Sequence, residues 1–153
     1  MIQRKQSIYL FLIVILSVIL VQFDPSFYKT QDPNTEQVIQ VGYSTTTMGA
    51  EVVGQNTGMI YLFYAVALLS LITIFLYRNR KLQMKLIMGV IAFGIVVMIN
   101  MYHYSIGMNY FEQGTTEFTS FAISPVAILL LGILALRGVQ KDEKLVRSVD
   151  RIR

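Results

Sequence analysis

Four long runs of the chain contain no charged residue, and they set the frame for the rest of the sequence. They cover residues 7–23, 59–77, 86–104 and 119–136. At a rise of about 1.5 Å per residue, each run would form a helix of roughly 26–29 Å, which is close to the hydrocarbon thickness of a bilayer. Every Asp, Glu, Lys and Arg falls outside these runs. The pattern predicts a bundle of four transmembrane helices.

The composition agrees with a membrane protein. Of the 153 residues, 54% are hydrophobic and only 14% are charged, whereas about 25% of residues are charged in soluble domains. The chain has no cysteine, which excludes disulfides and every catalytic or metal site that needs a thiolate. The first run follows Arg4 and Lys5 as in a signal peptide, but residues 21–25 offer no small-residue cleavage site. We therefore expect this run to be retained as a span.

The basic residues predict how the chain is threaded through the membrane. Of the 13 Lys and Arg residues, only Lys29 lies in the loops that a four-span chain places opposite its termini. Because Lys and Arg accumulate on the cytoplasmic side, we expect both termini in the cytoplasm, facing the anionic lipids of that side of the membrane. Topology then explains the net charge of +4, and no nucleic-acid partner is needed.

The outer loop at 24–58 is long enough to have structure of its own. It opens with two Asp-Pro turns and continues with a β-favouring run at 37–47, a turn at 48–51 and a return through Val52 and Val53. A lone hairpin is marginal in water, so we expect it to lean on the helix ends and to pair with 115–118 in the second outer loop, 105–118. The prediction is an all-α membrane protein, one domain over 1–153, with a small β-containing cap.

The other connections are expected to be helical. The link at 78–85 is too short for a domain, so helix should continue into it. Pro125 predicts a kink in the fourth helix, or else a re-entrant start at Ser124 and Pro125. The cytoplasmic tail at 137–153 is predicted as an amphipathic helical extension that either rests on anionic lipid or docks a membrane-protein partner. The candidate partner-binding residues are Leu145, Arg147, Val149, Arg151 and Ile152.

One group of polar residues lies inside a predicted span. Asn100, His103 and Tyr104 are spaced i, i+3 and i+4, so they share a helix face near the outer surface. Polar residues within spans are candidates for function. Because Met98, Met101 and Met108 flank the only histidine, the group is open to interpretation as a Cu(I) or small-molecule site. The alternative is a structural role at the interface, with methionine filling gaps between helices.

Other kinds of chemistry find less support in the sequence. The spans hold no ionisable residue away from His103, which argues against proton-coupled transport. The outer acids, among them Asp24 and Glu51, lack the spacing of a calcium loop. We therefore predict no catalytic residue and no cofactor. The leading hypothesis is a non-enzymatic accessory or scaffold subunit of a larger assembly for protein export or envelope biogenesis, and the alternative is small-molecule or Cu(I) binding and transport.

The two ends of the chain carry a resemblance to a known family. The segments MIQRKQSIYL at 1–10 and KDEKLVRSVDRIR at 141–153 resemble short bacterial inner-membrane proteins that are classed only as a domain of unknown function. The resemblance implies a Gram-negative inner-membrane protein with four helices. It implies no activity, no cofactor and no catalytic residue.

Overall fold

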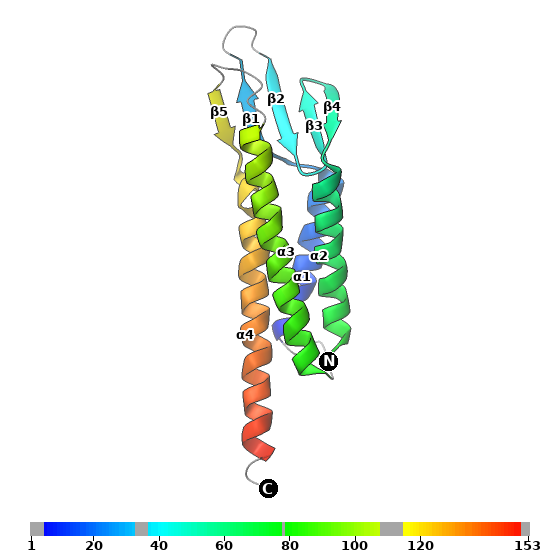
Figure 1. Ribbon diagram of the computed structural model, residues 1–153, viewed down its shortest axis with the longest axis vertical. Helices are drawn as coiled ribbons and strands as arrows, with labels where there is room; N and C mark the ends of the chain where they lie inside the picture. Colours follow the sequence, from blue (N-terminus) through cyan, green and yellow to red (C-terminus); the bar gives the residue numbers. More distant parts are fainter. Residues whose placement is uncertain (1–4, 33–36, 78, 108–114, 151–153) are drawn as a thin grey trace.

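The computed structural model describes residues 5–32, 37–77, 79–107 and 115–150, and it stacks a sheet on one end of a helical bundle (Figure 1). The helices are α1 (Lys5–Phe23), α2 (Thr57–Phe75), α3 (Arg80–Gly107) and α4 (Ser124–Asp150). Each is long and apolar enough to cross a membrane, so the four predicted helices are confirmed. The helical link is confirmed too, because α3 begins at Arg80.

The helices form a ring in which each contacts its neighbours in sequence and α4 closes against α1. Their inner faces are buried, while many large apolar side chains on the outer faces are exposed, as expected where lipid replaces water. Two glycines bring α3 and α4 close together. A Cβ atom at Gly94 would lie 2.8 Å from Leu129 Cδ2, and one at Gly132 would lie 3.0 Å from Ile91 Cγ1.

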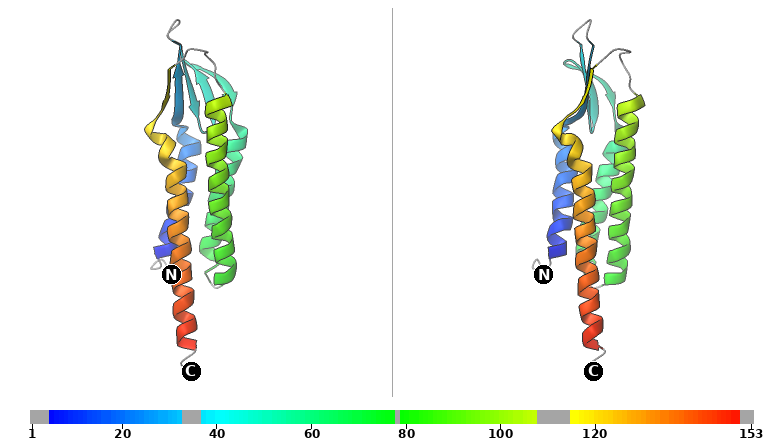
Figure 2. Two further views of the ribbon diagram at one scale, coloured as in Figure 1. Left: turned by 60° about the vertical axis from the view of Figure 1, so that its left-hand side comes forward. Right: turned by 90° about the vertical axis from the view of Figure 1, so that its left-hand side faces the viewer.

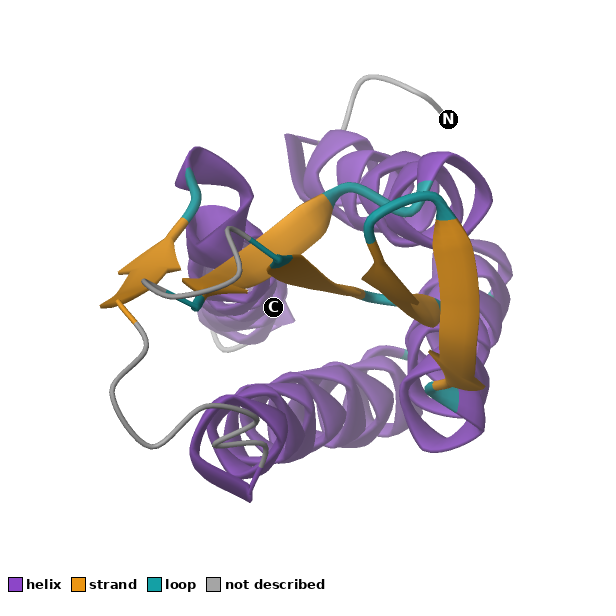
Figure 3. Cartoon of the chain, turned by 90° about the horizontal axis from the view of Figure 1, so that it is seen from above, coloured by secondary structure: helices purple, strands orange, loops and turns teal. Residues whose placement is uncertain are grey.

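The sheet has five antiparallel strands and lies across the upper end of the bundle (Figure 3). The strands are β1 (Ser26–Gln31), β2 (Val38–Gly42), β3 (Thr45–Met48), β4 (Glu51–Gln55) and β5 (Thr115–Phe118). Their order is β4-β3-β2-β1-β5. The predicted turn and return strand are confirmed as the β3–β4 hairpin, which turns at Gly49 with a φ of 61°. The run at 37–47, expected as a single strand, instead forms the antiparallel pair β2 and β3. The edge strand β4 exposes both Val52 and Val53.

The prediction of the cap is wrong in one respect and incomplete in another. The segment 115–118 is a strand of the cap, as expected, but it pairs with β1 instead of the predicted hairpin. Strand β1 lies between the two Asp-Pro dipeptides, where no strand was predicted. A β-bulge between Ser26 and Tyr28 breaks the alternation of β1, so the consecutive residues Phe27 and Tyr28 are both buried and no period of two is visible. With five strands, the protein is not all-α.

The expected kink or re-entrant segment at Pro125 is also wrong. A 3-10 turn, η1 (Ser120–Ile123), leads into α4, which begins at Ser124 and continues to Asp150. Pro125 therefore sits in the first turn, where the N–H that proline lacks would have no helical partner anyway. The predicted helical tail is the last part of α4, and it extends beyond the ends of the other three helices (Figure 2).

Candidate functional site

Asp24 makes structural hydrogen bonds at the junction between the sheet and the helices. Asp24 follows α1 with a φ of 44°, in the left-handed region that Asp tolerates. Its Oδ1 accepts a hydrogen bond from Ser44 N at 2.6 Å, and its Oδ2 accepts bonds from Thr45 N at 2.9 Å and from the Thr45 hydroxyl at 2.5 Å. A Cβ atom on Gly42 would lie only 2.5 Å from Asp24 Oδ1. The carboxylate is thus a structural clamp on the β2–β3 turn.

Tyr43 is the largest fully buried side chain of the same junction. Its ring packs between Phe27 and Phe63, at centroid distances of 5.0 and 5.2 Å. Its hydroxyl donates to the carbonyl of Phe121 at 2.8 Å and lies 2.8 Å from Ser124 Oγ. Burial raises the pKa of Tyr43 to about 12, and the bond with Ser124 offsets part of that rise. The neutral phenol joins the sheet to α2 and to the start of α4.

The candidate outer-face residues are only partly brought together. The Asn100 side-chain amide donates to Val96 O of its own helix at 3.0 Å. The ring centroids of His103 and Tyr104 are 6.3 Å apart in an edge-on arrangement, and the His103 side chain is exposed. Met101 packs against the core. Within the described ranges, no three His, Asp or Glu side chains gather in a way that could hold a metal ion.

The candidate partner-binding residues lie at the opposite end of the molecule. Leu145 is 57% exposed on the projecting part of α4, and the neighbouring Val146 is 41% exposed. The side chains of Arg147 and Val149, and all of Arg151 and Ile152, lie outside the described residues.

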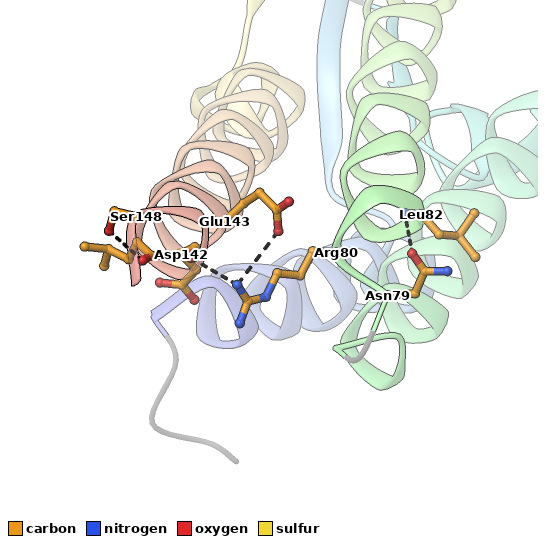
Figure 4. A network of polar contacts seen from close by, with 7 residues as sticks. Asn79, Arg80, Leu82, Asp142, Glu143 and Ser148 are labelled. Atoms are coloured by element: carbon orange, nitrogen blue, oxygen red, sulfur yellow. Dashed lines mark hydrogen bonds and ion pairs between the residues drawn. The ribbon is translucent and has the colours of Figure 1, made fainter. Parts of the chain in front are cut away.

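A polar contact between α3 and α4 at this end escaped the sequence analysis. Arg80 Nη1 donates to the carbonyl of Asp142 at 3.0 Å and lies 3.8 Å from Glu143 Oε2 (Figure 4). Next to it, Asn79 Oδ1 accepts from Leu82 N at 3.2 Å, as an N-cap side chain does. The opposite charges of link and tail were the available signal, but only the folded bundle brings them together.

Two cavities flank this contact. One, of about 530 Å³, is lined by Asn79, Arg80, Lys81, Glu143 and Val146. The other, of about 370 Å³, is lined by Met84, Gln140, Glu143 and Lys144. Because Glu143 lines both, we treat them as one surface, the α3–α4 groove. It is rich in basic side chains and lies beside the projecting part of α4.

The family of the chain follows from a comparison with known protein families. A family model described as a domain of unknown function (DUF4293) matches residues 2–152. The chain belongs to the DUF4293 family. This agrees with the resemblance seen at the two ends in so far as it pointed to a domain of unknown function. No curated protein matches the sequence. Since the DUF4293 description assigns no activity, function has to be inferred from the geometry of the chain.

Proposed function

We propose that the chain is an integral protein of a bacterial inner membrane, with both termini in the cytoplasm, and that it is a non-enzymatic accessory subunit that presents the end of α4 to a protein partner. The observation that carries this proposal is the unbroken course of α4 from Ser124 to Asp150. The helix runs alongside the others and then leaves the bundle in the same direction (Figure 1).

The length of the projection favours a protein over lipid as the partner. Arg137 is the first charged residue after the apolar part of α4, and Leu145 lies eight residues later, roughly 12 Å further along the axis. The headgroup layer adds only about 5–8 Å on each side of the hydrocarbon core. An upright helix therefore holds the exposed Leu145 and Val146 beyond the layer that lipid can cover.

The distribution of charge supports the proposed orientation. The start of α3 and the later part of α4 lie at the end of the bundle opposite the sheet (Figure 1). These segments carry basic residues, among them Arg80, Lys81, Arg137 and Lys144. Basic residues flanking spans favour the cytoplasmic side. A C-terminal reporter that is active only in the cytoplasm should therefore function, and the same reporter placed in the β3–β4 turn should not. The reverse result would contradict the orientation.

The partner role is tested by a charge placed on the projecting helix. Leu145→Asp removes an exposed apolar side chain, whereas Ser148→Asp adds the same charge to the same helix without doing so. Each tagged chain is purified from its native membrane in mild detergent, and the co-purifying proteins are quantified by mass spectrometry. We expect a stoichiometric partner with the wild type and with Ser148→Asp, and at least about a tenfold loss with Leu145→Asp.

Two results would contradict the accessory role. One is the absence of a stoichiometric partner from the wild-type preparation, and the other is full retention of the partner by Leu145→Asp. Membrane insertion of each variant, measured by resistance to carbonate extraction, shows that a lost partner does not reflect a lost protein.

A further inference from the structure

The α3–α4 groove combines positive charge with a position at the edge of the apolar spans. Arg80 and Lys81 contribute from the first turn of α3, and Lys144 contributes from α4. Among the residues that the structure describes, Glu143 is the only acidic side chain that lines it. The lining therefore carries an excess of positive charge, which suits an anion.

Arg80 keeps donors available in this groove. Both of its contacts, with the Asp142 carbonyl and with Glu143, are made by Nη1. A guanidinium has five N–H donors in a planar fork, and Nε and Nη2 make no hydrogen bond to any residue that the structure describes. The contact with Glu143 is long, at 3.8 Å. It holds the arginine on the groove wall and leaves room for a bidentate anion such as a phosphate.

The depth of the groove points to the headgroup layer. Arg80 is the first residue of α3, and Lys144 lies seven residues after Arg137, roughly 10 Å past the end of the apolar run of α4. The headgroup region is about 5–8 Å thick, so the backbone at Lys144 lies just beyond it and the long lysine side chain is able to reach back into it. Met84 lines the groove, and Met88, one turn further into the span, is 52% exposed. An apolar track thus leads from the groove along α3 toward the bilayer core.

We propose that the α3–α4 groove binds the headgroup phosphate of an anionic phospholipid, with Arg80, Lys81 and Lys144 as its ligands and Met84 and Met88 in contact with its acyl chain. Basic pockets between transmembrane helices are a recurrent form of lipid recognition. The proposal does not rest on the partner role of Leu145, because the side chains assigned to the lipid are others.

The test measures lipid binding to the full chain by native mass spectrometry. The protein is purified in detergent and titrated with phosphatidylglycerol or with phosphatidylcholine. A groove variant changes Arg80, Lys81 and Lys144 to Gln. A matched control changes Lys85, Arg137 and Lys141 to Gln, which removes the same charge from the same end but from side chains that do not line the groove.

We expect the wild type and the control to prefer phosphatidylglycerol, and the groove variant to lose at least about tenfold in its affinity for that lipid, because each basic residue near an anionic headgroup contributes roughly fivefold. If the groove variant unfolds, Lys144→Gln alone, at an exposed position, should still weaken binding by about threefold to fivefold.

Three outcomes would overturn the proposal. Equal binding by wild type and groove variant shows that the lipid lies elsewhere. An equal loss in groove variant and control shows that only the overall charge of this end matters. Displacement of the lipid by millimolar inorganic phosphate shows a site for a soluble anion instead of a phospholipid.

Discussion

The two ends of the molecule are built in opposite ways. At the sheet end, Asp24, Tyr43 and Asn56 tie the strands to the helices through buried or half-buried hydrogen bonds. At the other end, α4 continues alone past its neighbours, and Arg80 makes one hydrogen bond and one long ion pair across an open groove. The sheet end therefore uses its buried polar groups for contacts within the chain, whereas the projecting end keeps charged and apolar groups available to other molecules.

The largest loss of stability is expected at the sheet end, from a substitution that fills the space beside Asp24. In Gly42→Ala the new Cβ would lie 2.5 Å from Oδ1 and 2.9 Å from Cγ of Asp24, so the carboxylate has to leave its donors. We expect a loss of about 3 kcal/mol in unfolding free energy, measured in detergent. Gly54→Ala is the control, because nothing lies within 4 Å of its Cβ position. An equal effect of both variants would contradict the clamp.

The buried phenol predicts a dependence of stability on pH. Tyr43 has a pKa of about 12 in the folded protein against 10.0 in its unfolded reference, so the folded state holds this proton more tightly. Its contribution to stability is present below pH 10 and is lost as the pH rises to 12, by about 2 kcal/mol in all. Unfolding followed from pH 9 to 12 should show this loss in the wild type and a shallower one in Tyr43→Phe. Superimposable pH profiles of wild type and Tyr43→Phe would contradict the contribution of the Tyr43 phenol.

At neutral pH the same substitution measures the hydrogen bonds of Tyr43. Tyr43→Phe should cost about 1 kcal/mol, at the low end of such losses because Ser124 Oγ still donates to the Phe121 carbonyl. Tyr61→Phe provides the comparison. Because Tyr61 is 73% exposed, the loss of its hydroxyl should change the free energy of unfolding little. Thermal unfolding in detergent distinguishes them, and a larger effect at Tyr61 would reverse the assignment.

The smallest effect is expected at the projecting end. Glu143→Gln removes the long ion pair with Arg80, whose partners are each about one-fifth exposed, while the bond from Arg80 to the Asp142 carbonyl remains. We expect a change below about 0.5 kcal/mol, because such a pair contributes little. A loss of unfolding free energy as large as that of Gly42→Ala would show that polar contacts stabilise both ends of the molecule equally.

The helices were predictable from the sequence because the signal for a span is local. A charge-free run of sufficient length predicts a membrane helix whatever its neighbours are, and all four runs are helices. The β3–β4 hairpin was predictable for a similar reason, since Gly49 supplies the turn. The start of α4 was not, because the same Pro125 is compatible with a kink or with a first turn.

Strand β1 and the α3–α4 groove depend on contacts between distant parts of the chain. Tyr28 pairs with Phe118, and their rings lie 5.4 Å apart, yet ninety residues separate them in the sequence. Arg80 and Glu143 meet only because α3 and α4 are neighbours in the ring. Pattern analysis finds a segment and its face, but it does not find the partner that the fold brings to it.

The edge strand β4 has a consequence for the behaviour of the protein in a crowded bilayer. Exposed edges with apolar residues such as Val52 and Val53 invite antiparallel pairing with another copy. The strands run roughly along the helix axes (Figure 1), so copies inserted with the same orientation present edges that point the same way. An antiparallel ladder between them would require one copy to be upside down. Uniform insertion thus leaves this edge only the parallel pairing with another copy, which is slightly less stable per residue, and the antiparallel pairing becomes accessible once the protein is extracted into detergent.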